Sequence, residues 1–137
     1  MVEIVGLAPH HLDGVLRLCA EEGWPSFPAD PARALRALTA PGVTSVVAIR
    51  EDEVVGFAQV LSDGEIQSYL ALLSVDRRFR RQGIAQALLR EAAARAGGVR
   101  IDLLSEETAA GFYERLPHRR KPGYRIFPPF SVERGDD

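Results

Sequence analysis

Cysteine is almost absent from this sequence, and the single residue, Cys19, excludes an internal disulfide and any cysteine-rich zinc site. Cys19 lies at helical spacing from Leu12, Val15 and Leu16, which indicates a core residue rather than a nucleophile. An excess of charge of one sign is also lacking, since the formal net charge of the 137 residues is −2. Domains that bind nucleic acid usually carry a basic excess, so this balance disfavours a nucleic-acid partner.

Long hydrophobic runs are missing as well. No stretch approaches the roughly 20 apolar residues that span a bilayer. The N-terminus has no basic segment followed by an apolar run, so we expect no signal peptide, no membrane partner and a cytoplasmic protein. The hydrophobic fraction of 46% and the charged fraction of 26% are typical of globular proteins. This length and composition predict a single domain over residues 1–137.

Changes in hydrophobic period along the chain predict an α/β fold with a mixed sheet. We expect strands at 2–7, 43–49, 54–61, 65–75 and 99–104, and helices at 9–22, 31–40, 84–96 and 106–115. The strand at 65–75 is apolar on both faces, which indicates a central position. The segment Trp24–Pro28 is expected to be a loop, a last strand is one option for Tyr124–Phe127, and Asp136 and Asp137 are expected to fray.

The most informative pattern lies between Leu72 and Ala85. It combines an apolar strand, a basic loop and an alanine-rich helix, with Arg80-x-x-Gly83-x-Ala85 at the helix start. The first amides of a helix lack intrahelical acceptors and carry the positive end of the helix dipole. A glycine there lets the backbone approach a ligand closely, so this turn can bind a phosphate or pyrophosphate. The simpler interpretation of its arginines is a solvated basic turn.

The spacing resembles the pyrophosphate-binding motif of the GNAT superfamily of N-acetyltransferases, Gln/Arg-x-x-Gly-x-Gly/Ala. A second match follows, where the segment beginning at Glu106 is similar to the family pattern Asn-x-x-Ala-x-x-Phe-Tyr. Ala109, Phe112 and Tyr113 match, whereas the asparagine position is Glu106. The resemblance implies a mixed, centrally splayed sheet flanked by helices, in an N-acetyltransferase that uses acetyl-coenzyme A and no metal.

The same resemblance implies which residues form the site. Backbone groups of Leu73 and Val75 would pair with the pantetheine arm by strand addition. Tyr113 matches the tyrosine that protonates the leaving thiolate in many relatives, and a phenol of pKa ~10 suits a thiolate of pKa ~8.5. A packed tyrosine beside Phe112 is the alternative. The amides that would bind the coenzyme A pyrophosphate are those of Arg80, Arg81, Gln82, Gly83, Ile84 and Ala85.

The group that removes the proton from the attacking amine is left open. The glutamate of some relatives corresponds to Tyr69, which is not a base near neutral pH. Glu65 acting through water, Glu22 and bulk solvent are the candidates. Trp24 and Phe27 lie where relatives often wall the acceptor pocket, although Trp24 is equally compatible with the core.

Three functions follow from these patterns. The first is transfer of an acetyl group to a primary amine of a small molecule or a protein. The second is a non-catalytic module that binds acyl-coenzyme A as a sensor or assembly partner. The third, a nucleic-acid-binding domain built on the basic loop, is disfavoured by the net charge. The identity of the acceptor and the presence of a homodimer are left open.

Overall fold

The computed structural model describes residues 1–130, so Asp136 and Asp137 lie outside the described part. The described residues fall into two compact units, 1–102 and 103–130. A single domain over the whole chain stays a prediction. Within residues 1–130, every helix is too short or too polar to cross a membrane.

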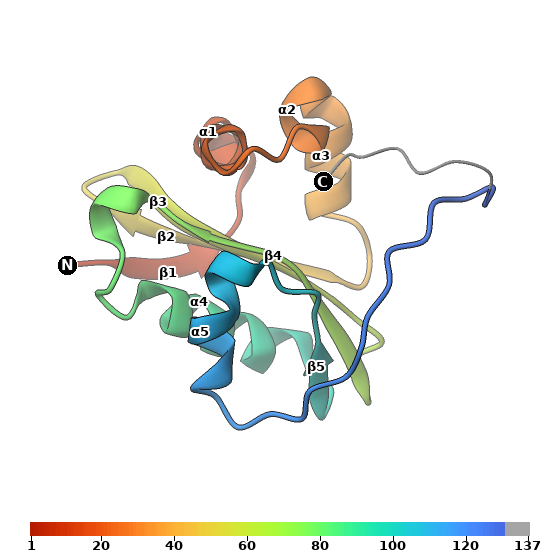
Figure 1. Ribbon diagram of the computed structural model, residues 1–137. Helices are drawn as coiled ribbons and strands as arrows, with labels where there is room; N and C mark the ends of the chain where they lie inside the picture. Colours follow the sequence, from red (N-terminus) through yellow and green to blue (C-terminus); the bar gives the residue numbers. More distant parts are fainter. Residues whose placement is uncertain (131–137) are drawn as a thin grey trace. The chain divides into compact units, whose positions relative to one another are not determined.

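The first unit is built on a five-stranded sheet with the order β1-β2-β3-β4-β5 (Figure 1). Neighbouring strands are antiparallel except β4 and β5, which are parallel. This is the mixed sheet that the sequence predicts, although the last strand is shorter than expected. The strands are β1 (Glu3–Gly6), β2 (Val43–Arg50), β3 (Glu53–Ser62), β4 (Gln67–Val75) and β5 (Arg100–Asp102).

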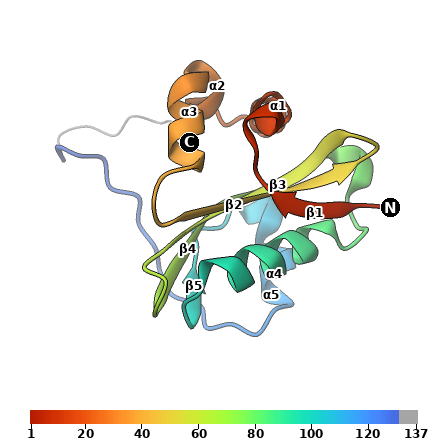
Figure 2. The same ribbon diagram turned by 180° about the vertical axis from the view of Figure 1, so that it is seen from behind.

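Helices cover both faces of the sheet. α1 (Leu12–Glu22), α2 (Ser26–Ala29) and α3 (Pro31–Leu38) lie on one face, and α4 (Ile84–Ala96) lies on the other (Figures 1 and 2). α4 connects β4 to the parallel strand β5, as predicted. Single turns of 3₁₀ helix occupy Pro9–His11 and Arg77–Phe79.

Local chemistry explains where these elements begin and end. Gly23 ends α1 in the left-handed region, with φ 79°. The Asp30 side chain accepts a hydrogen bond from the Arg33 amide (3.1 Å) and caps α3. Glu51 and Asp52 both have positive φ, which is the conformation of a tight hairpin turn between β2 and β3.

The segment Trp24–Pro28 is not entirely a loop, because α2 begins within it. The amide of Ala29 donates to the carbonyl of Pro25 (3.1 Å), which closes one helical turn. Two prolines in this segment argue against a helix in the sequence. Proline is nevertheless tolerated in the first turn, where its missing N–H has no partner to lose, and α2 is no longer than that turn.

The main core lies between the sheet and helices α1 and α3. Cys19 is only 1% exposed and belongs to this core, as its helical spacing predicted. Trp24 and Phe27 pack against the same core while part of each side chain stays exposed. The buried members of the cluster are Val15, Leu18, Cys19, Leu38, Val47, Val54 and Phe57.

On the opposite face, α4 buries Ile84, Leu88 and Ala92 against the sheet. The helix approaches β3 closely at Gly56. A Cβ atom there would lie 3.0 Å from the Leu88 side chain and 3.0 Å from the carbonyl oxygen of Ser74. The lack of a side chain at Gly56 therefore lets α4 pack closely against β3.

The second unit contains a 3₁₀ turn at Glu107–Ala109 and the short helix α5 (Ala110–Glu114). The expected last strand at Tyr124–Phe127 is wrong, since the structure assigns no strand there. Tyr124 is 83% exposed, and Ile126 is 66% exposed. Prolines flank the segment on both sides, and each removes a backbone donor that a paired strand would use.

Candidate active site

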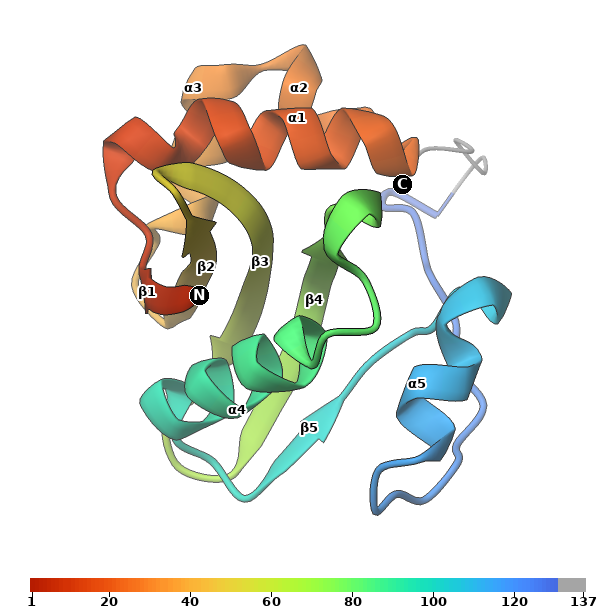
Figure 3. The ribbon, with the colours of Figure 1, turned by 90° about the vertical axis from the view of Figure 1, so that its left-hand side faces the viewer.

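The parallel strands β4 and β5 separate as they run toward their C-terminal ends (Figure 3). Their ladder covers only Gln67 to Tyr69 on β4, whereas β4 continues to Val75. Within residues 1–130, no other strand pairs with this outer edge of β4. The predicted adjacency, parallel direction and splaying of the two strands are therefore confirmed.

The register with β3 shows which backbone groups face the unpaired edge. The amide of Asp76 donates to the carbonyl of Val55 (2.8 Å), so these two residues form a hydrogen-bonded pair. Such pairs alternate along an antiparallel ladder, and Ser74 is the next bonded residue of β4. Leu73 and Val75 therefore direct their N–H and C=O groups away from β3, toward the open edge. Their binding of a pantetheine arm stays a prediction.

The loop after β4 ends at the N-terminus of α4. Gly83 has φ 80°, and a Cβ atom there would meet nothing within 4 Å, so the space beside it is open. Ile84 begins a helix of 13 residues, whose positive dipole end faces this space. Within residues 1–130, the amides of residues 81–85 donate no hydrogen bond. The geometry therefore fits the pyrophosphate that the motif predicts.

A buried carboxylate ties this loop to the rest of the first unit. Asp76 is 4% exposed, and it accepts hydrogen bonds from the Arg78 amide (2.9 Å) and the Arg78 guanidinium (2.9 and 3.1 Å). It also accepts one from Arg17 of α1 (3.1 Å), which donates to the carbonyl of Val54 (2.8 Å). The Arg78 side chain, more than any other group, holds the pKa of Asp76 well below its usual range.

The arginines of the loop divide into two kinds. Arg78 pairs with Glu53 (2.7 Å), and its guanidinium lies 5.0 Å from the centre of the Phe79 ring. Within residues 1–130, the side chains of Arg77 and Arg81 form no hydrogen bond or ion pair and are exposed. The interpretation of the loop as a uniformly solvated basic turn therefore fails for Arg78, which has a structural role.

A second polar cluster lies beside the open edge, on the face that α1 covers. Ser74 donates its hydroxyl to Oε2 of Glu22 (2.7 Å), the last residue of α1. Arg80 donates Nε to the carbonyl of Val75 (2.9 Å), and its Nη2 lies 3.4 Å from the same Glu22 oxygen. Glu22 was one of the candidate bases from the sequence, whereas Ser74 was not predicted. The sequence marks Ser74 only by its hydroxyl within an apolar strand.

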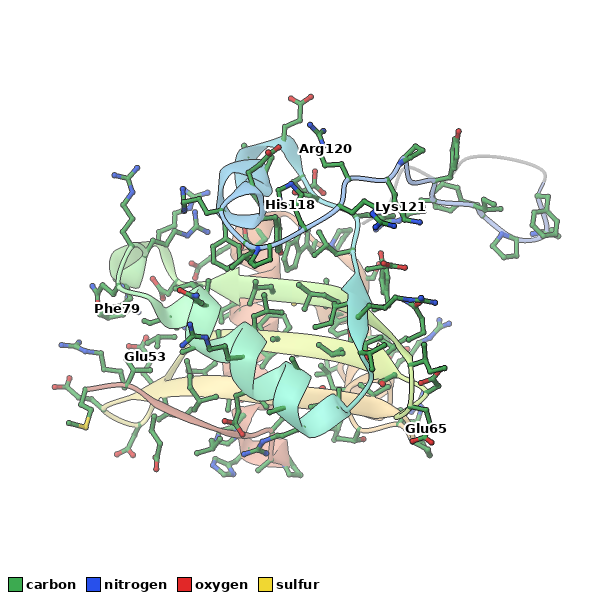
Figure 4. All side chains as sticks on the ribbon, turned by 90° about the horizontal axis from the view of Figure 1, so that it is seen from below. Glu53, Glu65, Phe79, His118, Arg120 and Lys121 are labelled. Atoms are coloured by element: carbon green, nitrogen blue, oxygen red, sulfur yellow. The ribbon has the colours of Figure 1, made fainter. Side chains whose placement is uncertain are left out.

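Tyr113 and Glu65 are the remaining candidates. Tyr113 belongs to α5, where its ring meets Phe112 edge to face with centroids 5.0 Å apart. Burial raises the pKa of Tyr113 to about 12, so its phenol is protonated at neutral pH. Its role as an acid stays a prediction. Glu65 is exposed and precedes β4, and Figure 4 places it at the opposite end of the sheet from Phe79.

No metal site accompanies these groups in the part of the chain that the structure describes. Among residues 1–130, no group of three or more histidine, cysteine, aspartate or glutamate side chains could hold a metal ion.

Comparison with known proteins agrees with this arrangement. The family described as acetyltransferase (GNAT) domain matches residues 41–116, which is more than half of the chain. A proposed acetyltransferase from Deinococcus radiodurans R1 is 26% identical, with a TM-score of 0.73 over 93% of this chain and 88% of that one. No curated protein matches the chain in sequence.

Two further solved structures share the fold. The ribosomal-protein-alanine N-acetyltransferase of Brucella melitensis biovar Abortus 2308 is 18% identical, with a TM-score of 0.73 over 92% of this chain and 97% of that one. An aminoglycoside N-acetyltransferase solved with coenzyme A is 19% identical, with a TM-score of 0.72 over 91% of this chain and 94% of that one. The family match over the strands and helix that form the candidate site shows that this chain belongs to the GNAT acetyltransferases and is an acyltransferase.

Proposed function

We propose that this protein transfers an acetyl group from acetyl-coenzyme A to a primary amine of a small molecule or a protein. The observation that carries the proposal is that two unpaired backbone surfaces follow one another in the chain. The open edge of β4 ends at Val75, and the loop of residues 76–83 leads from it to the open N-terminus of α4 at Ile84. Coenzyme A has a matching chemistry, since its extended arm contains amides and its other part is a pyrophosphate.

Backbone groups carry most of the binding in this proposal. The amides of Arg80 to Ala85 bind the pyrophosphate at the helix start. The N–H and C=O groups of Leu73 and Val75 pair with the amides of the arm, as an added strand would. The thioester then lies along the splayed part of β4, where β5 no longer occupies the edge.

The chemistry requires a neutral amine. Its nitrogen attacks the thioester carbon, a C–N bond forms, and the C–S bond breaks as the electron pair leaves on sulfur. Tyr113 gives its phenolic proton to that sulfur. The surplus proton of the amine passes to solvent, and solvent in turn returns a proton to Tyr113.

Two classes of acceptor amine fit this function. The relatives include one named for a ribosomal-protein alanine and others named for aminoglycosides, so both protein and small-molecule amines are candidates. The family match favours an enzyme over the acyl-coenzyme A sensor considered from the sequence.

The test is release of free thiol from acetyl-coenzyme A by the purified protein. The panel contains sisomicin, benzylamine and a peptide with an N-terminal alanine, and each product is identified by mass spectrometry. We expect amine-dependent release, which Gly83→Glu abolishes because its carboxylate repels the pyrophosphate. Gly64→Glu is the matched control, since Gly64 also has positive φ and open space at Cβ. Equal coenzyme A affinity in the two variants would contradict the proposal.

A further inference from the structure

Glu22 occupies an unfavourable position for a carboxylate. It is the last residue of α1, where the helix dipole is negative, and Glu21 beside it adds a second negative charge. Arg17 compensates Glu21 at 2.8 Å. Within residues 1–130, the only cation that forms an ion pair with Glu22 is Arg80, whose Nη2 lies 3.4 Å away. A carboxylate at this end of a helix favours a bound cation.

Ser74 fixes this carboxylate beside the candidate coenzyme path. Its hydroxyl donates to Glu22 Oε2 (2.7 Å), and Ser74 itself is only 3% exposed. Ser74 lies between Leu73 and Val75, whose backbone groups face the open edge of β4. Neighbouring residues of a strand are only about 3.3 Å apart. Because Glu22 is bonded to Ser74, it lies beside the proposed path of the coenzyme arm, on the face of the sheet that α1 covers.

Arg80 links the carboxylate to that edge. Its Nε donates to the carbonyl of Val75 (2.9 Å), which is one of the acceptors that the coenzyme arm requires. The same guanidinium makes the long contact with Glu22, and about half of the side chain is exposed. Such exposed ion pairs are weak, so the guanidinium can leave at small cost. An amide of the coenzyme arm that binds the Val75 carbonyl competes with this guanidinium, and the pyrophosphate nearby offers it a stronger partner.

We propose that Glu22 binds the ammonium group of the acceptor, and that Arg80 occupies this carboxylate until coenzyme binding draws the guanidinium away. The inference rests on the proposed function and specifies its acceptor: an amine that is protonated at neutral pH, bound after the coenzyme. Glu22 binds the cation, and the bound ammonium loses its proton to solvent before the nitrogen attacks. Amines that are neutral at this pH gain nothing from Glu22.

The test compares two isomeric amines, benzylamine, which is protonated at neutral pH, and 4-methylaniline, which is neutral. Wild-type protein, Glu22→Gln and the control Glu21→Gln are assayed for thiol release with each amine. Glu22→Gln replaces a charged hydrogen bond to the ammonium with a neutral one. We therefore expect it to lower kcat/KM for benzylamine by about 10–100-fold. Values for 4-methylaniline, and both values for Glu21→Gln, should change by less than about twofold.

Coenzyme A affinity, measured by calorimetry, separates the possible failures. Glu22→Gln should bind coenzyme A as tightly as wild type or more tightly, because Arg80 loses a competing partner. Weaker coenzyme binding by this variant, equal losses with both amines, or no loss with benzylamine would overturn the role of Glu22. Absence of coenzyme A binding or of amine-dependent thiol release in the wild-type protein would contradict the proposed function itself.

Discussion

Asp76 is almost fully buried, and the hydrogen bonds from Arg78 and Arg17 stabilise its charged form. Because these bonds hold the pKa of Asp76 below its usual range, the folded protein binds fewer protons here than the unfolded chain. The stabilisation is complete above the ordinary carboxyl pKa of about 4 and is lost as pH falls toward the lowered value.

Asp76→Asn should therefore lower the free energy of unfolding at pH 7 by about 2–3 kcal/mol. The difference from wild type should shrink as pH falls below about 4. Urea denaturation at pH 7, 5 and 3 measures both effects. Glu53→Gln is the control, since it removes an exposed partner of Arg78 and should cost less than about 1 kcal/mol. A constant difference across this pH range would contradict the assignment.

A substitution at Tyr113 tests its proposed role as the acid that protonates the leaving sulfur. A positioned acid contributes about 10²–10⁴-fold, so Tyr113→Phe should lower kcat by a factor that corresponds to roughly 3–5 kcal/mol. Coenzyme A affinity should hardly change, because the proposed binding groups are backbone amides and carbonyls. Since burial raises the pKa of Tyr113 to about 12, its deprotonation should not reduce wild-type activity between pH 7 and 10. Steady-state kinetics with calorimetry decides the matter, and equal kcat values with rate-limiting chemistry would remove Tyr113 from the mechanism.

At the scale of the element, β4 has one paired edge and one partly open edge. The amide of Ser74 faces β3, whereas the amides of Leu73 and Val75 face the open side. In the free protein, hydrogen exchange should be slow at Ser74 and fast at the two flanking residues. Saturating coenzyme A should slow exchange at Leu73 and Val75 and leave Ser74 unchanged, as NMR-detected exchange would show. Protection confined to α4 would mean that the arm does not pair with this strand.

At the scale of the whole molecule, a ligand that binds only the folded state stabilises it by mass action. Coenzyme A at about 100 times its Kd should add about 2.7 kcal/mol to the free energy of unfolding. For a chain of this length, this corresponds to a rise in Tm of roughly 5–10 °C. Differential scanning calorimetry should find that rise in wild type and in Gly64→Glu. An equal rise in Gly83→Glu would show that the coenzyme binds elsewhere.

Local sequence patterns determined most of the elements and the family. The limits of α4, the cap at Asp30 and the end of α1 at Gly23 follow from helix periodicity and capping, which act over a few residues. The motif from Arg80 to Ala85 was visible for the same reason, because its glycine and the helix start are neighbours in the chain. The turn of α2 was missed, since its prolines usually mark a loop.

Only the tertiary structure decided which side chains meet. Glu22 and Ser74 are separated by 52 positions, and Arg17 and Asp76 by 59, so no local pattern could pair them. The open edge of β4 also depends on how far the ladder with β5 extends, which is set by pairing between distant segments. The expectation of a strand at Tyr124–Phe127 was wrong for the same physical reason, because a strand needs a partner that the local sequence does not specify.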